Sequence, residues 1–261
     1  MTDSAGASTL EDMNFLEFFA IAEQDRDILN PIGPEKLEKV AAYAGLRDGL
    51  SVLDVGSGKG ALLRQWARNW DIRGVGLELN PAFVQQAREL TQAAGLTEKL
   101  SFWEGKALDF PVKVAGYDVA VCLGATFAIG TFSEAVAWMG AHVKPGGVLI
   151  VGDVVLNSEQ AVREAPQNLV GWSHLPPTLA GRCQEFQTAD VELIGLSVSS
   201  TDDWDHYTSL MWSAVDRWAA QHPEHPNRTE VLQNVQEGKV KYLNWEREHL
   251  GWAVMVGRVT G

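Results

Sequence analysis

The chain has 261 residues, enough for one large α/β domain or one domain that carries an insert. Its 46% hydrophobic and 21% charged residues are typical of a globular protein. The formal net charge of −13, without any Lys/Arg cluster, argues against binding to nucleic acid or to an anionic membrane and favours a small-molecule partner.

The two cysteines, Cys122 and Cys183, are too far apart in sequence for a CxxC pair and form no disulfide framework, which is typical of a reducing compartment. The first 15 residues have no basic stretch followed by an apolar one, and no apolar run is long enough to span a bilayer. We therefore expect a cytoplasmic protein. No His/Asp/Glu cluster has the spacing of metal ligands, so no metal is expected.

The N-terminal part is expected to be helical. Residues 1–8 are small and polar, and Ser8 with Glu11 has the spacing of a capping box at the start of a short amphipathic helix. The sequence NPIG at 30–33 predicts a turn, and a second helix is expected from Pro34 to Tyr43.

From residue 51 the chain alternates between strand and helix patterns, which predicts βαβ units and a parallel sheet covered on both faces. The expected strands are 51–55, 73–79, 99–105, 117–124 and 146–153, and the expected helices are 59–70, 81–95 and 133–143.

After Asp153 the alternation breaks. Residues 154–178 are loop-like, and a helix near 178–188 and a strand at 191–198 follow. Two helical segments at 206–220 and about 228–248 precede a last apolar strand at 250–259. We interpret 200–248 as a helical hairpin inserted between the last two strands.

The glycine-rich stretch VLDVGSGKG at 52–60 predicts a tight strand-to-helix turn of the kind that holds a nucleotide-like cofactor, although such a turn alone is weak evidence. Its spacing is GxGxG, whereas the dinucleotide fingerprint is GxGxxG. Asp54 would repel a pyrophosphate but suits a cationic ligand without phosphate, such as S-adenosylmethionine (SAM). Glu78 ends the next strand and can accept both ribose hydroxyls.

Four motifs together carry a family resemblance: VLDVGSGKG, GVGLELN, YDVAVCLGATF and HVKPGGVLIVGD. In order and spacing they resemble the motifs of class I SAM-dependent methyltransferases, over about residues 30–153 and again in the strand 250–259. The stretches NPIGPEKLEKV and LGATF and the late aromatic helices resemble a small-molecule, largely uncharacterised branch of that family.

The resemblance implies a Rossmann-like fold with a seven-stranded, mostly parallel sheet whose last strand is reversed. It implies an N-terminal helical lid at 1–45, a SAM-binding core at 46–199 and 249–261, and an inserted helical cap at 200–248. SAM would lie across the carboxyl ends of the first strands.

The resemblance also implies the cofactor-binding residues. Asp54 and the turn Gly56, Ser57, Gly58 and Gly60 would meet the methionine part of SAM, Glu78 the ribose and Leu79 the adenine, with Leu123 and Gly124 beneath the methyl group. The family usually has an acid after the glycine that ends the third strand, where this chain has Lys106 and Ala107. Because lysine cannot accept a hydrogen bond, the Ala107 backbone with Asp109, or stacking alone, would hold the adenine.

Methyl transfer from a sulfonium depends mainly on positioning, and a general base is needed only for a nucleophile that is protonated at neutral pH. The candidate catalytic residues are His206 and Asp153, although Asp153 could equally be a helix N-cap or turn residue. The candidate substrate contacts are Trp172, His174, Trp204 and Tyr207. His174 could instead be a surface loop residue, and Asp202 or Asp203 is interpreted as a helix N-cap.

The sequence therefore predicts a SAM-dependent methyltransferase that acts on an N, O or S nucleophile of a small molecule. Two alternatives stay open: a nicotinamide-dependent oxidoreductase on a similar sheet, and a non-catalytic SAM-binding protein. The acceptor and the oligomeric state are not predicted.

Overall fold

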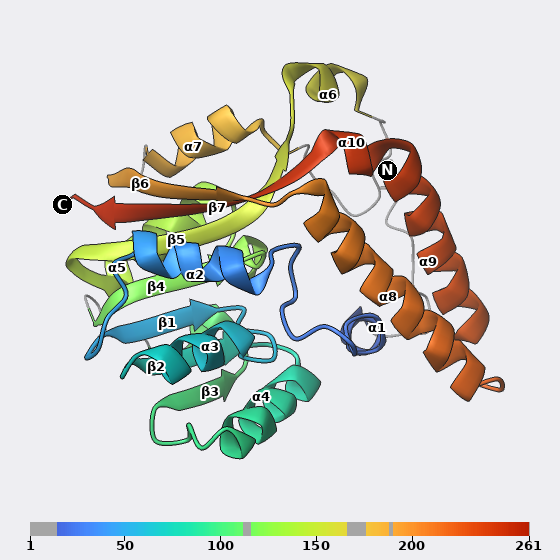
Figure 1. Cartoon of the computed structure of the whole chain (residues 1–261), viewed down its shortest axis with the longest axis horizontal. Coiled ribbons are helices and arrows are strands. Elements are labelled where there is room, and N and C mark those ends of the chain that lie inside the picture. The colour runs from blue at the N-terminus through green and yellow to red at the C-terminus, as the bar shows by residue number, and fades with distance from the viewer. Residues whose placement is uncertain (1–14, 112–115, 166–175, 188–189, 261) are drawn as a thin grey trace, which may run out of the picture.

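The computed structural model describes residues 15–111, 116–165, 176–187 and 190–260. Its centre is one seven-stranded sheet with the order β3-β2-β1-β4-β5-β7-β6, in which β7 runs antiparallel to both neighbours (Figure 1). The strands are β1 Ser51–Val55, β2 Arg73–Glu78, β3 Leu100–Glu104, β4 Tyr117–Leu123, β5 Val143–Leu156, β6 Val191–Val198 and β7 Leu250–Val259. This confirms the predicted fold class, including the reversed last strand.

Helices cover both faces of the sheet, because nearly every residue of the central strands is apolar and must be buried on each side. The helices of the core are α2 Pro34–Tyr43, α3 Ala61–Asn69, α4 Pro81–Ala93, α5 Phe132–His142, α6 Glu159–Glu164 and α7 Leu179–Gln187. Helices α2, α3 and α4 pack in one apolar cluster with Val52, Val121 and Ile150, whereas α5 and α7 pack in a second cluster with Leu53 and Cys122. The alternation of side chains along each strand separates the two clusters.

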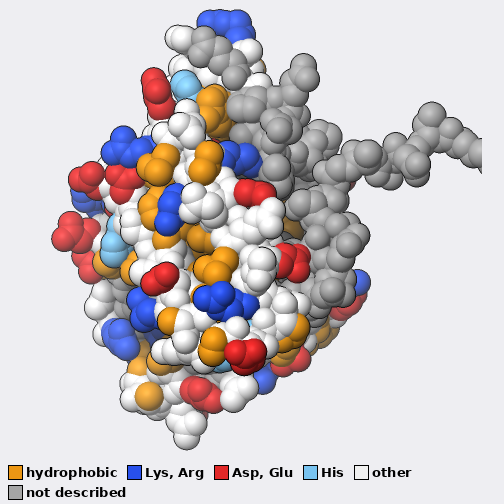
Figure 2. All heavy atoms as spheres, turned by 90° about the vertical axis from the view of Figure 1, so that its right-hand side faces the viewer, with side chains coloured by type: hydrophobic (Ala, Val, Ile, Leu, Met, Phe, Trp, Pro, Cys, Tyr) orange, Lys and Arg blue, Asp and Glu red, His pale blue; other side chains and the backbone are white. Residues whose placement is uncertain are grey.

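A third apolar cluster joins the first described helix to the inserted hairpin. Helix α1 (Phe15–Ala22) packs on α8 (Thr201–Gln221), which packs on α9 (Arg228–Lys241), and the buried Trp218 and Val231 belong to this cluster. In Figure 1 the α8–α9 hairpin extends beyond the edge of the sheet, with α1 beside α8. Figure 2 shows this side of the molecule, where hydrophobic side chains lie among charged ones.

The observed helices differ from the predicted ones at their ends, because capping side chains decide where a helix begins. Helix α8 begins at Thr201 because Ser200 is the N-cap and Asp203 completes the capping box, so neither Asp202 nor Asp203 is the N-cap. Helix α6 occupies part of the segment expected to be loop-like, with Ser158 as its N-cap. The predicted helix at about 228–248 is divided into α9, a π-helical turn (Tyr242–Glu246) and the short α10 (Arg247–His249).

Strand β5 continues to Leu156, three residues beyond the predicted end. It does so because β7 pairs with it along its whole second half, and Asp153 lies opposite Ala253. Asp153 is therefore inside a strand and is not a helix N-cap. The predicted Ser8–Glu11 capping box lies outside the described residues. Among the described helices, none is long and apolar enough to cross a membrane.

Candidate active site

The glycine turn after β1 adopts a conformation that only glycine accommodates easily. Gly58 has a φ of +53°, and its backbone N–H donates to Glu78 Oε2 at 2.9 Å. A Cβ on Gly58 would lie 2.7 Å from Leu29 Cδ1, so the N-terminal segment packs directly on the turn. The carboxyl ends of β1 and β2 and the chain before α2 therefore meet at one place.

Asp54 lies at this place, only 4% exposed, and no described residue forms a hydrogen bond or ion pair with its carboxylate. Burial, and then the negative charge of Glu78, raises the pKa of Asp54 to about 7. A buried carboxylate without a cation is costly, and such groups are typical of ligand sites.

Asp54 opens into a pocket between the N-terminal segment and the glycine turn. The lining residues are Asp27, Ile28, Leu29, Asn30, Leu37, Asp54, Gly56, Ser57, Gly58, Ala61, Leu62 and Leu123. Two polar atoms of this lining, Asn30 Oδ1 and Ser57 Oγ, are buried without a hydrogen-bond partner among the described residues. The pocket therefore offers two oxygens and a carboxylate to a polar ligand.

Glu78 ends β2 and is held by the backbone. Its Oε1 accepts from Asn80 N at 2.8 Å while its Oε2 accepts from Gly58 N. Leu79, the next residue, is 50% exposed at this edge of the sheet. A carboxylate fixed in this way keeps lone pairs for two adjacent hydroxyls.

The third strand is followed by the 3₁₀ turn Ala107–Asp109, in which Ala107 is buried and Lys106, just before it, is exposed. Beyond β4, Leu123 is half-buried and Gly124 has a φ of +82°. A Cβ on Gly124 would lie 2.8 Å from the Trp252 ring, so that glycine also makes room for an indole. The predicted cofactor residues thus lie along one edge of the sheet, at the ends of β1, β2, β3 and β4.

Asp153 lies in a different environment, on the face covered by α5 and α7. Its Oδ2 is 3.6 Å from Arg182 Nη2 and accepts from Thr126 Oγ1 at 3.3 Å. The Arg182 guanidinium lies 4.2 Å from the centroid of the Phe132 ring. Burial raises the pKa of Asp153, and Arg182 opposes that rise. The carboxylate predicted to be catalytic is therefore held in an ion-pair network.

The aromatic candidates on α8 are also engaged. Tyr207 donates from its hydroxyl to Leu29 O at 3.3 Å, and the Arg26 guanidinium lies 3.4 Å from the centroid of its ring. Trp204 packs on the core and has an edge-to-face contact with Tyr207. Both lie inside α8, not at its boundary.

His206 is exposed on α8 and lines a second, wider cleft, which lies between the N-terminal segment and α8. Asp25, Arg68 and Asp202 also line this cleft. Trp172 and His174 lie outside the described residues. Among the described residues, no group of three His, Cys, Asp or Glu side chains is placed to hold a metal.

Sequence reasoning missed three residues that shape the pocket: Asn30, Lys59 and Arg26. Lys59, in the middle of the glycine turn, is buried and donates to the backbone of the N-terminal segment. The lysine within GSGKG and the asparagine of NPIG were visible signals, but their partners are distant in sequence.

Sheet order, reversed β7, glycine turn and paired acids Asp54 and Glu78 together define a class I methyltransferase architecture. The family model described as a methyltransferase domain matches residues 52–147. The solved SAM-dependent methyltransferase of Geobacter sulfurreducens, in complex with S-adenosylhomocysteine, superimposes with a TM-score of 0.83 at 28% identity, covering 92% of this chain and 96% of that one.

Two curated relatives extend the comparison. The uncharacterized protein YjhP of Escherichia coli strain K12 is 29% identical over 93% of this chain and 98% of its own length. Erythromycin 3''-O-methyltransferase of Saccharopolyspora erythraea is 31% identical over 69% of this chain and 63% of that protein. These similarities in sequence and fold support a class I SAM-dependent methyltransferase with SAM as its cofactor.

Proposed function

We propose that this enzyme transfers the methyl group of SAM to an N, O or S nucleophile of a small molecule at the carboxyl edge of the sheet. The observation that carries the proposal is the buried Asp54 beside the glycine turn, which has no cation partner among the described residues. The relative named as an erythromycin 3''-O-methyltransferase supports a small-molecule acceptor.

The residues of the pocket fit SAM better than a dinucleotide. Asp54 and the unpartnered Ser57 hydroxyl can bind an ammonium and a carboxylate, whereas Asp54 would repel a pyrophosphate. When bound, SAM supplies a methyl group activated by a sulfonium. In this proposal Asp54 and the turn Gly56, Ser57, Gly58 and Gly60 hold the methionine part.

The other predicted cofactor residues take the remaining parts of SAM in the same proposal. Glu78 accepts from the ribose hydroxyls, and Leu79 packs on the adenine. Ala107 closes the far side of the adenine with its backbone, and Lys106 points its charge to solvent. Leu123 and Gly124 form the floor beneath the transferable methyl group.

Catalysis would come mainly from positioning, which can contribute about 7–11 kcal/mol to lowering the barrier. A nucleophile that is protonated at neutral pH would also have to lose that proton, and His206 and Asp153 stay its predicted acceptors. His206 is exposed in an outer cleft, whereas Asp153 would have to leave Arg182. Trp204, Tyr207, Trp172 and His174 stay predicted contacts to the methyl acceptor.

In this proposal each predicted segment has one role. Residues 1–45 form a lid, residues 46–199 and 249–261 form the SAM-binding core, and residues 200–248 form a cap over the acceptor site. Cytoplasmic location and the lack of a nucleic-acid partner also stay predictions.

Incubation with SAM tritiated on its methyl group, and panels of alcohols, phenols, amines and thiols, tests this function. We expect label in one class of acceptor and saturable binding of S-adenosylhomocysteine. Binding of SAM without transfer to any class would favour a non-catalytic protein, and binding of NADH alone would contradict the proposal.

A further inference from the structure

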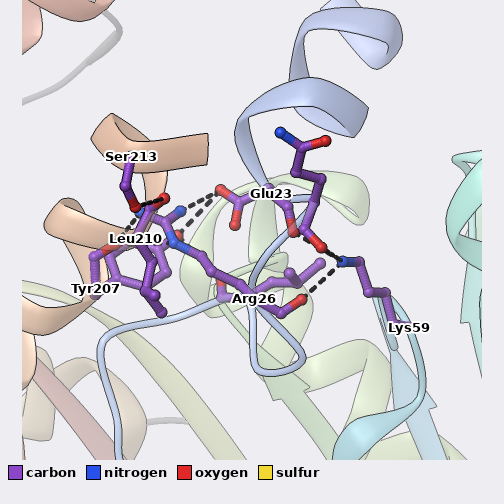
Figure 3. Close-up of polar contacts among 8 residues, drawn as sticks. Glu23, Arg26, Lys59, Tyr207, Leu210 and Ser213 are labelled. Atoms are coloured by element: carbon purple, nitrogen blue, oxygen red, sulfur yellow. Dashed lines mark hydrogen bonds and ion pairs between the residues drawn. The ribbon is translucent and has the colours of Figure 1, made fainter. Parts of the chain in front are cut away.

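The N-terminal segment is fastened to the glycine turn by a buried lysine. Lys59 is 4% exposed, and its ammonium donates to the backbone oxygens of Glu23 at 2.8 Å, Gln24 at 3.2 Å and Arg26 at 2.7 Å (Figure 3). These oxygens follow the end of α1, where a cation is favoured by the helix dipole. All three protons of the ammonium are donated to backbone oxygens, so Lys59 binds the N-terminal segment and has no proton left for a ligand.

The same segment is held from the side of α8. Arg26 and Glu23 form a buried ion pair, and Arg26 also donates to the backbone oxygen of Tyr207 (Figure 3). Burial, opposed by the charge of Glu23, lowers the pKa of Lys59. A charged network at this depth is costly to form, and it is stable only when its members stay in place together.

Three further contacts hold the chain between Arg26 and Pro31. Arg64 Nη2 lies 2.5 Å from Asp27 Oδ1, the Tyr207 hydroxyl donates to Leu29 O, and the Leu29 side chain packs on Gly58. The backbone just before Asn30 is therefore held by α8 and by the glycine turn, and Asn30 follows it into the pocket lining.

Asn30 Oδ1 has no donor among the described residues, although it is buried and lines the same pocket as Asp54. Leaving an acceptor unpaired costs about 1–3 kcal/mol. A carboxylate and an amide oxygen in one pocket together form acceptors for a group with several N–H donors and a positive charge.

We propose that Asn30 is a cofactor-binding residue that accepts a hydrogen bond from the α-ammonium of SAM, and that Lys59 is the positioning residue that holds Asn30 there. The proposal rests on the cofactor site assigned above. It gives the N-terminal segment a direct role in binding SAM.

Calorimetric binding of two ligands tests the role of Asn30. S-adenosylhomocysteine has the ammonium, whereas 5′-methylthioadenosine lacks both the ammonium and the carboxylate. We expect Asn30→Leu to bind S-adenosylhomocysteine about ten-fold more weakly and 5′-methylthioadenosine within about two-fold of the unmodified protein. Asn30→Asp keeps an acceptor, so its affinity for S-adenosylhomocysteine should stay within about three-fold.

Two results would overturn this assignment. An equal loss of both ligands in Asn30→Leu would mean that Asn30 only shapes the pocket. A loss in Asn30→Asp as large as in Asn30→Leu would place Asn30 at the carboxylate instead. Failure of the unmodified protein to bind S-adenosylhomocysteine would instead contradict the cofactor site as a whole.

A double-mutant cycle tests the role of Lys59. If Lys59 acts through Asn30, Asn30→Leu should cost about ten-fold in the unmodified background but less than about two-fold in Lys59→Met. Asp27→Asn removes the ion pair between the segment and Arg64 at an exposed side chain. It replaces Lys59→Met as the second background if that variant does not fold. Equal costs of Asn30→Leu in all backgrounds would overturn the positioning role.

Gln24→Leu is the matched control for a loosened segment. The Gln24 side chain donates to Ala214 O at 2.8 Å on α8 and does not line the pocket. Because this variant keeps the contacts of Lys59, we expect its affinities for both ligands to stay within about two-fold of the unmodified protein. Selective loss of S-adenosylhomocysteine in this variant would mean that the contact with α8, and not Lys59, positions Asn30.

Discussion

Asp54, which is buried, and Asp153, which is half-buried, are carboxylates on opposite faces of one sheet, near the same edge. Asp54 shares its face with Val52 and the N-terminal segment, whereas Asp153 shares its face with Val151, α5 and α7. Burial raises the pKa of both. In the part of the chain that the structure describes, Asp153 has a cation within ion-pair distance, Arg182, whereas Asp54 has none.

The difference distinguishes a carboxylate that already has a cation from the protein from one that has none among the described residues. The cation of Asp153 belongs to the protein, so its ion pair exists without substrate or cofactor. Asp54 faces Glu78 instead, and its missing positive charge would be supplied by SAM. Four measurements test this difference between the two carboxylates.

The largest expected effect is on the pH dependence of stability without cofactor. The pKa of Asp54 rises from 3.8 to about 7 on folding, so its contribution is complete below pH 3.8 and is lost as the pH rises to about 7. Relative to Asp54→Asn, the unmodified protein should lose about 4 kcal/mol of unfolding free energy between these limits. Urea unfolding at pH 5 and pH 8 should record about 3 kcal/mol of this loss, because part of it already occurs below pH 5, and a pH-independent difference would contradict it.

The next effect is on cofactor binding. Asp54→Asn removes the charge that would face the ammonium, so we expect S-adenosylhomocysteine to bind about 100-fold more weakly at pH 8. Binding to the unmodified protein should also strengthen as the pH rises from 6 to 8, because the carboxylate must be ionised. Asp153→Asn is the matched control and should bind normally; a comparable loss there would erase the distinction.

A smaller effect is expected at the paired carboxylate. Arg182→Met leaves Asp153 buried without its cation and should lower the unfolding free energy by about 2–3 kcal/mol. Affinity for S-adenosylhomocysteine should change less than three-fold. If Asp153→Asn instead reduced the rate of methyl transfer at least 100-fold without loss of stability or binding, Asp153 would be catalytic as the sequence predicts.

The smallest effect concerns the Thr126 hydroxyl, which donates to Asp153 at 3.3 Å. Thr126→Val keeps the shape of the side chain and removes this hydrogen bond, so we expect a loss of about 1 kcal/mol in unfolding free energy. Thermal unfolding measures it. No additional loss from Thr126→Val in the Arg182→Met background would show that the two partners act as one network.

The sheet and most of its helices could be predicted because their signals are local. SVLDV at 51–55 has apolar residues on both faces, and Gly56 to Gly60 require a turn, so strand, turn and helix can be inferred within ten residues. The extension of β5 to Leu156 could not be inferred in this way, because it depends on pairing with β7, about 100 residues later.

The residues of the candidate site also fall into two groups: those that local sequence signals predict and those that depend on contacts between distant segments. Asp54 and Glu78 were predictable from their places at strand ends, and the hydrogen bond from Gly58 joins the two segments. The partner of Asp153 comes from α7, whose packing no motif reveals. Lys59 adjoins the predicted turn residues, but the sequence does not reveal that its side chain points to the segment after α1. That orientation depends on how the segment packs on the glycine turn.

The burial of Lys59 also gives the protein a chemical reporter. An ammonium that donates to three backbone oxygens is protected from amine-reactive reagents, whereas the exposed Lys106 on the same edge of the sheet is open to them. The ratio of labelling at these two lysines, read by mass spectrometry, would record how often the segment lifts from the glycine turn without any engineered probe.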